Sequence, residues 1–288
     1  MADISAADVM KLRKITGQGM MDCKAALNES GGDVDKAVEI LRRKGLATMA
    51  KRAERETSEG LVITRAAGDG RTTVLACLCC ETDFVAKSED FKAAAATMGE
   101  YAMACTQDEG AQNLAETQLK GKRFADLLTE LVSKTGEKTL VGDYAKFTLS
   151  GPGLITTYIH FNGKVGAMVQ IDADSEAVSG SEAIKKVAAD VAMHITAAKP
   201  LALDHSGIDP DIVAREKAIF ADQIKGKPAE IVDKIVEGKM KKFYAENCLL
   251  DQPFVKDDKK SVAEIVAEAT RKAGGQAKIA RFVRFEVG

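Results

Sequence analysis

The residues that could carry out chemistry are few, and the first group among them is a run of cysteines. Cys77, Cys79 and Cys80 stand together in an apolar stretch. A zinc site needs four ligands, which proteins usually supply as spaced pairs of Cys or His. No second pair of Cys or His follows in this sequence. The pattern therefore favours a buried strand, and we predict that the chain holds no metal.

The three histidines are far apart in the sequence and lack catalytic partners. His194 lies on the apolar stripe of an expected helix, where a buried, hydrogen-bonded histidine is typical. His205 follows Asp204 in a loop without a nucleophile nearby. His160 stands near the tip of an expected hairpin, an exposed place that suits a binding residue. The sequence has no phosphate-binding loop and no GxGxxG, GxSxG or HExxH motif. We predict that the chain is not an enzyme and needs no cofactor.

Two other segments have the character of contact surfaces. Met20 and Met21 begin a helix, and neighbouring helix positions point about 100° apart, so both cannot face one small core. Exposed Met is an adaptable binding residue, although both could pack within a loose three-helix core. The second segment, Thr82–Val85, connects a buried strand to a helix capped by Ser88. Its Phe84 is either a plug in the core or a protruding contact, and the residues alone leave both open.

The charge balance argues against a protein that binds nucleic acid directly. The 288 residues include 41 Lys and Arg against 43 Asp and Glu, which gives a net charge of −2. Domains that bind phosphate backbones are usually strongly basic. The first residues lack the basic start and apolar run of a signal peptide, and no stretch is long and apolar enough to span a membrane. We expect a soluble, cytoplasmic protein.

The elements that must position these residues begin with three short helices within residues 1–56. Ser5 caps the first helix, and Asp8 completes a capping box. The apolar face of this helix is formed by Val9, Leu12 and Ile15. Gly45 stands where the third helix is expected to end. The basic segment 42–55 predicts a solvated linker helix rather than an RNA-binding arm.

Two β-hairpins then recur at an offset of 93 residues. The first turns through Asp-Gly at 69–70 and the second through Asn-Gly at 162–163, dipeptides that accept the positive φ angles of tight turns. A helix capped by Ser88 follows the first hairpin, and a helix capped by Ser181 follows the second. The pattern predicts two related subdomains, each an antiparallel sheet with helices on one face.

A helical hairpin at about residues 209–248 is inserted in the second subdomain, with its break at Gly-Lys-Pro, residues 226–228. Its apolar stripes can pack on each other or on another subunit. The expected fold class is α+β: a small three-helix N-terminal domain, then two related antiparallel-sheet-plus-helix subdomains with a helical hairpin insertion. The expected domains are 1–56, 57–140 and 141–288.

Two runs of residues carry a resemblance to a known family. Residues 16–24 read TGQGMMDCK and residues 80–87 read CETDFVAK. Both are similar to signatures of the translation elongation factor Ts family. Further similar segments follow in the family's order at 192–195, 237–243, 252–255 and 284–288. Together these segments span almost the whole chain.

The resemblance implies a guanine-nucleotide exchange factor for the GTPase elongation factor Tu. It also implies that the three-helix domain resembles a ubiquitin-associated domain, and that the helical hairpin makes homodimer contacts in some members. By the same resemblance, the segment that would disturb the partner's Mg²⁺ site consists of Thr82, Asp83, Phe84 and Val85. The residues that would hold the partner are Leu12, Arg13, Met20, Met21 and His160, the last of them near the phosphate loop.

The sequence departs from the family pattern in two places. The family often has Gln where this chain has Glu81, which adds a charge beside the Thr82–Val85 segment. Many members continue beyond residues 284–288 into a C-terminal helical module that also contacts the partner, whereas this sequence ends at Gly288. An alternative function is that of a non-enzymatic adaptor whose three-helix domain binds peptides or other proteins.

Overall fold

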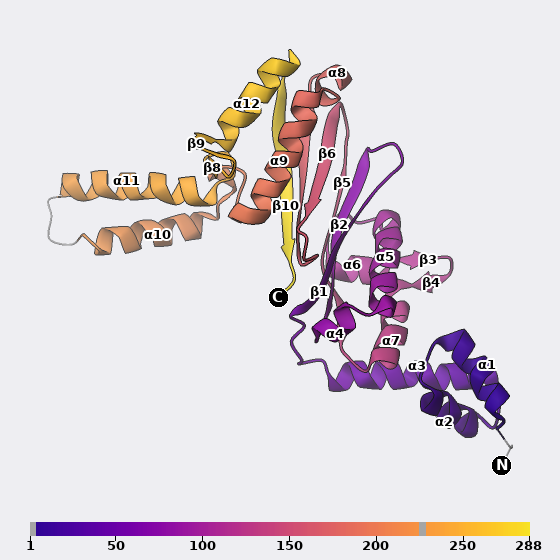
Figure 1. Cartoon of the computed structure of the whole chain (residues 1–288). Coiled ribbons are helices and arrows are strands. Elements are labelled where there is room, and N and C mark those ends of the chain that lie inside the picture. The colour runs from indigo at the N-terminus through magenta and orange to yellow at the C-terminus, as the bar shows by residue number, and fades with distance from the viewer. Residues whose placement is uncertain (1–3, 225–228) are drawn as a thin grey trace.

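The computed structural model describes residues 4–224 and 229–288 (Figure 1). Its first part, here called the N-terminal unit, consists of α1 (Ala6–Thr16), α2 (Met20–Ser30) and α3 (Val34–Lys51). The predicted capping box of Ser5 and Asp8 is confirmed. The predicted apolar face of α1 is wrong at Ile15, which is exposed, because α1 turns only Val9 and Leu12 fully into the small core of this unit.

The third helix does not end at Gly45, as the sequence suggested. It continues to Lys51 and lies across α7 (Phe124–Thr135). A Cβ atom at Gly45 would stand 2.5 Å from the carbonyl oxygen of Thr129. Gly45 therefore lets two helices approach closely, which is a different use of glycine from helix termination. The expected linker helix is the second half of α3. It packs on α7 at Gly45, while most of its other residues are exposed to solvent.

We expect Gly45→Ala to destabilise the protein, although alanine is the better helix former. The added Cβ must displace the backbone of α7, and overpacking of this kind costs about 1–3 kcal/mol, which exceeds the gain in helix propensity of about 1 kcal/mol. Urea unfolding followed by circular dichroism measures the change. The matched control is Gly238→Ala in α11 (Ala229–Asn247), where the Cβ meets nothing within 4 Å. That variant should be stabilised, and a gain of stability at Gly45 would contradict the close-contact interpretation.

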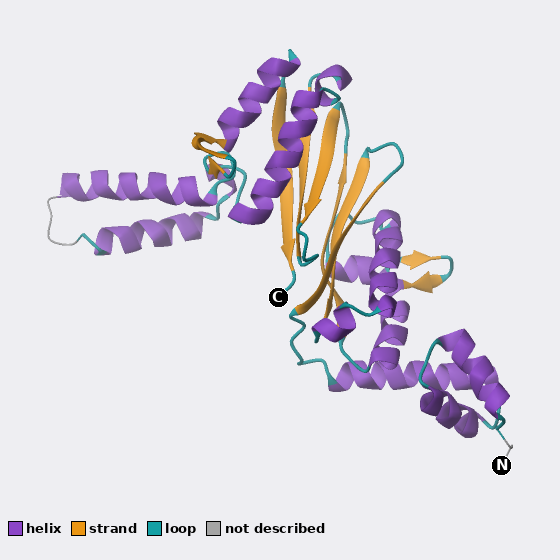
Figure 2. Ribbon diagram, viewed as in Figure 1, coloured by secondary structure: helices purple, strands orange, loops and turns teal. Residues whose placement is uncertain are grey.

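Each predicted hairpin belongs to a three-stranded antiparallel sheet. The first sheet has the order β1-β2-β5, from β1 (Glu59–Ala66), β2 (Thr72–Cys80) and β5 (Thr139–Thr148). The second has the order β10-β7-β6, from β10 (Ala277–Glu286), β7 (Val165–Ala173) and β6 (Gly153–Ile159). Helices α5 (Glu89–Ala104) and α7 cover the first sheet, and α9 (Glu182–Ala198) and α12 (Val262–Ala273) cover the second (Figure 2). The predicted α+β fold and its internal repeat are confirmed.

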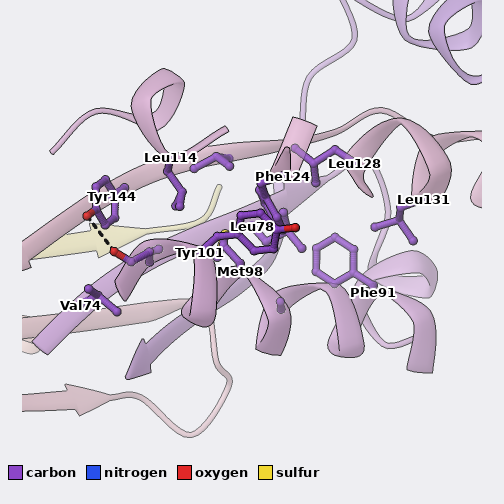
Figure 3. Close-up of a cluster of buried hydrophobic side chains, with 14 of the residues drawn as sticks. Val74, Leu78, Phe91, Met98, Tyr101, Leu114, Phe124, Leu128, Leu131 and Tyr144 are labelled. Atoms are coloured by element: carbon purple, nitrogen blue, oxygen red, sulfur yellow. Dashed lines mark hydrogen bonds between the residues drawn. The ribbon is translucent and has the colours of Figure 1, made fainter. Parts of the chain in front are cut away.

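The uncovered faces of the two sheets pack on each other. Side chains from both sheets share one buried cluster that includes Val62, Leu75, Ile155 and Met168. Strand β2 therefore has helices on one face and the second sheet on the other. The opposite face of β2 contributes to the core under α5 and α7, which Figure 3 shows around Met98 and Phe124. Double burial explains why β2 is apolar almost throughout.

The cysteine run lies in this doubly buried strand, as predicted. Cys77 and Cys79 face the second sheet, whereas Cys80 faces the helices. Burial is the main cause that raises the pKa of all three thiols, to about 11 for Cys79 and about 12 for Cys80. Protonated, buried thiols are poor nucleophiles.

The predicted boundary after residue 140 falls inside a strand. Strand β5 pairs with β2 from Thr139 to Thr148, so the first sheet continues beyond that boundary. The reason is that the third strand of each sheet follows its helices in the chain. The division into three domains otherwise remains a prediction. Between α5 and α7 lie α6 (Ala111–Glu116), β3 (Gln118–Leu119) and β4 (Lys122–Arg123).

The helical hairpin consists of α10 (Pro210–Asp222) and α11, and it projects away from the second sheet (Figure 1). The expected break at 226–228 lies outside the described residues. Lys239 of α11 stands over the ring of Phe220 of α10, 5.2 Å from its centroid. Short elements flank the hairpin, namely η1 (His205–Gly207), β8 (Pro253–Phe254) and β9 (Asp257–Ser261). Within the described residues, no helix is long and apolar enough to cross a membrane.

His194 is a buried histidine with both ring nitrogens engaged, as the sequence predicted. Its Nε2 lies 2.9 Å from Oε1 of Gln252, and its Nδ1 accepts a hydrogen bond from the backbone N–H of Val255. The amide group of Gln252 donates to the carbonyls of Ala198 and Glu246 and so presents Oε1 to the ring. This arrangement fits the neutral ring with its proton on Nε2, because Nδ1 is an acceptor.

We expect the free energy of unfolding to decrease as the pH falls from about 7.5 to about 5.5. Burial lowers the pKa of His194 in the folded protein, and the unfolded histidine has a pKa of about 6.5. Below that pH the unfolded chain gains a proton that the folded chain resists, so unfolding becomes easier. Urea titrations at both pH values should show a smaller decrease in His194→Gln. The control His205→Gln, which removes a half-exposed histidine, should keep the wild-type decrease. An equal decrease in His194→Gln would contradict this assignment.

Candidate functional site

Phe84 protrudes from the surface of the first subdomain. It belongs to a one-turn helix, α4 (Asp83–Ala86), and its side chain is 84% exposed. In the same turn Ala86 is buried and Val85 packs against the core under α5. The interpretation of Phe84 as a core plug is therefore wrong. An exposed aromatic side chain on a turn anchored by its neighbours is typical of a protein contact.

The backbone of this segment is held by polar contacts. Thr82 caps α4, because its Oγ1 accepts a hydrogen bond from the N–H of Val85. The N–H and Oγ1 of Thr82 in turn donate to the two carboxylate oxygens of Glu137, at 3.1 and 2.7 Å. Asp83 pairs with Lys87 at 2.6 Å, and the Lys87 hydrogen bond lowers the pKa of the Asp83 carboxyl. The backbone turn that carries Phe84 is therefore held in place by these contacts.

The internal repeat indicates that the fold itself does not require this phenylalanine. At the same offset of 93 residues, Ser175 caps a second one-turn helix, α8 (Glu176–Ser179), in the second subdomain. The residue equivalent to Phe84 is Ala177. The repeat thus uses the capped turn in both subdomains but carries a large aromatic side chain in only one. This difference favours a functional role for Phe84 over a structural one.

A second exposed aromatic residue lies at the tip of the β6–β7 hairpin. Phe161 is 93% exposed, and its ring centroid lies 4.4 Å from that of His160, which is half-buried. The tip is fixed to the first sheet, because the N–H of Val62 donates to the carbonyl of Gly163. His160 was a binding candidate from the sequence, whereas Phe161 was not. The available signal was a phenylalanine directly before a tight Asn-Gly turn, where no core is within reach.

The hairpin tip and the Phe84 segment lie at the same end of the paired sheets. Lys164, just after the tip, pairs with Glu59 at 2.7 Å. Glu59 is the first residue of β1 and stands opposite Cys80, the last residue of β2, from which the chain leads to α4. The C-terminus lies at this end too (Figure 1). We call Phe84, His160 and Phe161 the aromatic end of the core.

The N-terminal unit exposes both methionines of its signature. Met20 is 44% and Met21 is 75% exposed in the first turn of α2, and Arg13 of α1 is exposed as well. The expectation that both could pack in a loose core is wrong. Leu12 is fully buried in the core of the unit, and its contact with a partner stays a prediction. The Met20–Met21 pair, called here the methionine anchor, remains the candidate surface.

The loop before the methionine anchor is docked on α7. The side-chain amide of Gln18 donates to the carbonyl of Glu130 at 3.2 Å, and Ser133 Oγ donates to the amide oxygen of Gln18 at 3.3 Å. Gln18 is buried although it is polar, and these bonds satisfy it. The start of α2 is therefore positioned by the core as well as by its own unit.

One group of side chains has ligand types that could hold a metal ion. Within the described residues, His205, Cys248 and Asp251 bring one ligand atom each to within 4.8 Å of one another. The ring nitrogen of His205 is already 2.9 Å from the carboxylate of Asp251. Burial raises the pKa of the Cys248 thiol to about 11. With a protonated thiol and three ligands, the group is better described as a histidine in contact with a carboxylate beside a buried cysteine.

The fold and these surfaces first define a class: an α+β protein with the features of one that binds another macromolecule through anchored, exposed apolar side chains. Comparison with known proteins makes this specific. Residues 81–288 match the family model described as Elongation factor TS. The chain belongs to the elongation factor Ts family, and it is a translation elongation factor.

Curated relatives agree over nearly the whole chain. Elongation factor Ts of Nitratiruptor sp. is 44% identical over 287 residues, which cover 99% of this chain and 93% of the relative. The protein of the same name from Nitratidesulfovibrio vulgaris is 40% identical over 288 residues, covering 99% and 96%. That of Clostridium botulinum is 41% identical over 287 residues, covering 99% and 93%.

Proposed function

We propose that this chain binds elongation factor Tu in its GDP state and promotes the release of GDP, after which GTP can bind. Membership of the elongation factor Ts family supports the partner. The observation that carries the proposal is Phe84, which projects almost fully exposed from a turn that Thr82 and Glu137 hold in place. An apolar side chain held in this way is prepared to enter a pocket on another protein, because little ordering remains to be done on binding.

In this proposal the segment Thr82–Val85 acts on the Mg²⁺ site of the partner. Phe84 enters an apolar pocket of the GTPase, with Asp83 beside it, and the metal ion is displaced. The β-phosphate of GDP then loses its main countercharge, and the nucleotide can leave. The methionine anchor holds the nucleotide domain, and His160 contacts the partner near its phosphate loop. No step asks this chain for covalent chemistry, in keeping with the prediction that it is not an enzyme.

The energetics require more than one contact. A protein that weakens GDP binding by some factor is itself bound more weakly, by the same factor, when GDP is present. A shift of about 10⁴-fold needs about 5.5 kcal/mol of differential binding. Burying one Phe side chain supplies about 1.5–3 kcal/mol. The methionine anchor and the hairpin tip, including Phe161, therefore have to supply the rest of the differential binding energy.

The direct test is the release of fluorescent GDP from purified elongation factor Tu, with and without this chain. The proposal expects a strong acceleration in the presence of Mg²⁺ and a smaller effect when Mg²⁺ has already been removed. The alternative function, an adaptor that binds peptides through the N-terminal unit, expects no acceleration in either condition. Unchanged release would therefore reject the exchange-factor proposal.

A homodimer through the helical hairpin is a separate proposal. The hairpin projects from the core and exposes Ile212, Ile219 and Ile231 along its length. Sedimentation equilibrium across a range of protein concentrations tests it, because a dimer through this surface should dissociate when these isoleucines are replaced by Ser. Two further statements remain predictions. One is that the chain makes no direct contact with nucleic acid, and the other is that it resides in the cytoplasm.

A further inference from the structure

The methionine anchor and Phe84 lie on different parts of the molecule, and α3 connects them. Helix α3 packs on α7 at Gly45, and Arg42 of α3 pairs with Asp126 at 2.5 Å. The helix therefore does not swing freely about the core. The C-terminal end of α3 lies next to the segment that carries Phe84, because Arg52 at this end contacts the residue just before that segment.

Arg52 caps the end of α3 and binds the residue directly before the Phe84 segment. Its Nη1 donates to both carboxylate oxygens of Glu81, at 2.9 and 2.7 Å. The side chain of Glu81 is only 12% exposed, so water competes little for its carboxylate, whereas the side chain of Arg52 is 37% exposed. Although burial acts to raise the pKa of Glu81, hydrogen bonds from the N–H of Lys138 and from Arg52 outweigh it and keep this pKa below its usual value. The carboxylate of Glu81 is thus ionised, and its negative charge is paired with the positive charge of Arg52.

Lys138 completes the connection from the other side. Its backbone N–H donates to Glu81 at 2.7 Å, and its Nζ donates to the carbonyls of Ala53 and Arg55 at 2.6 and 2.8 Å. The residue before it, Glu137, holds Thr82. Residues 137–138 therefore form hydrogen bonds both with the chain that follows α3 and with the turn that carries Phe84.

We propose that Arg52 and Glu81 are positioning residues that fix the distance and angle between the methionine anchor and Phe84. The inference rests on the proposed exchange function. A partner bound at two points gains from the second contact only when the span between the points matches its own sites. A fixed span also removes the ordering cost that a loose arm would impose on binding. The Arg52–Glu81 pair thus serves GDP release without touching the partner.

The experiment compares charge reversals in the free chain and in the exchange assay. Arg52→Glu places two carboxylates together, and the swap Arg52→Glu with Glu81→Arg restores an opposite pair. The matched control is Arg43→Glu on the same helix, since Arg43 pairs with exposed Glu39 on its own helix rather than with the core. Spin labels at Asn28→Cys in α2 and Ala93→Cys in α5 report the distance between the N-terminal unit and the core. All six native cysteines are buried and should not take the label.

We expect Arg52→Glu to broaden the distance distribution and to slow GDP release by about tenfold, since small misplacements of a reacting group have effects of this size or larger. The swap should restore both readouts in part, because Arg at position 81 cannot accept the Lys138 hydrogen bond. Arg43→Glu should change neither. An unchanged rate in Arg52→Glu, with an active wild type, would overturn the inference. So would a slower rate with an unchanged distance and no rescue, because Arg52 would then act by direct contact. If the wild type itself fails to release GDP, the proposed function fails, and the distances still test whether the pair holds the arm.

Discussion

Phe84→Ala is expected to slow the release of GDP by about 10- to 150-fold and to leave the protein as stable as before. Phe84 is 84% exposed in the free chain, so its removal deletes almost no native contact. In the proposed complex its burial contributes about 1.5–3 kcal/mol, which converts to this range of rates. The free energy of unfolding should change by less than about 0.5 kcal/mol, as is usual for surface substitutions.

Stopped-flow release of fluorescent GDP measures the rate of release, and urea unfolding measures the free energy of unfolding. The control is Leu201→Ala, which removes a large apolar side chain of similar exposure at the root of the helical hairpin. It should leave the rate of release unchanged. A large loss of stability in Phe84→Ala, with normal exchange by the folded fraction, would show that the side chain serves the fold and that the proposed contact is elsewhere.

Replacing both Met20 and Met21 by Ala is expected to weaken the complex with nucleotide-free elongation factor Tu by about 30-fold. The two side chains are partly buried already, so complex formation can bury only the remainder, worth about 2 kcal/mol in total. Unlike Phe84→Ala, this change should act mainly on affinity. At a saturating concentration of the variant, GDP release should approach the wild-type rate, because the Thr82–Val85 segment is intact.

Isothermal titration calorimetry measures the affinity. Met10→Ala is a matched control, since Met10 is 54% exposed on α1 of the same unit but is not part of the methionine anchor. Equal weakening by Met10→Ala would mean that general apolar exposure, rather than this pair, holds the partner. An unchanged affinity in the double variant would remove the anchor from the proposal.

The sequence was a good guide wherever a local pattern decided the structure. The caps at Ser5, Ser88 and Ser181 and the turns at 69–70 and 162–163 are all present. In each of them the side chain of the cap or turn residue accepts a hydrogen bond from a backbone N–H two or three residues further on. The repeat followed from these signals, and with it the fold class.

The predictions were wrong mainly where a segment distant in the sequence determines the surroundings of a residue. Gly45 has the composition of a helix end, but α7 determines its role through a close backbone contact. Ile15 has the apolar spacing of Val9 and Leu12, yet it is exposed, because only those two residues reach the core of the N-terminal unit. The exposure of Phe84 could not be decided in advance, because an aromatic residue after a buried strand suits both a plug and a protrusion. Phe161 was missed although it stands directly before a tight Asn-Gly turn, a position beyond the reach of the core.

The double burial of strand β2 has a consequence during synthesis of the chain. Residues 72–80 form an uncharged, proline-free segment of β-forming residues, the composition that favours aggregation when such a segment is exposed. The ribosome delivers β1 and β2 first, whereas β5 and the whole second sheet follow later. Helices α5 and α7 precede these strands in the chain, so it is the face of β2 that packs on the second sheet which lacks its cover until then. Arg71 and Glu81, the charged residues on either side, stand where gatekeepers against self-association are found. Glu81 would therefore protect the nascent chain before it ever pairs with Arg52.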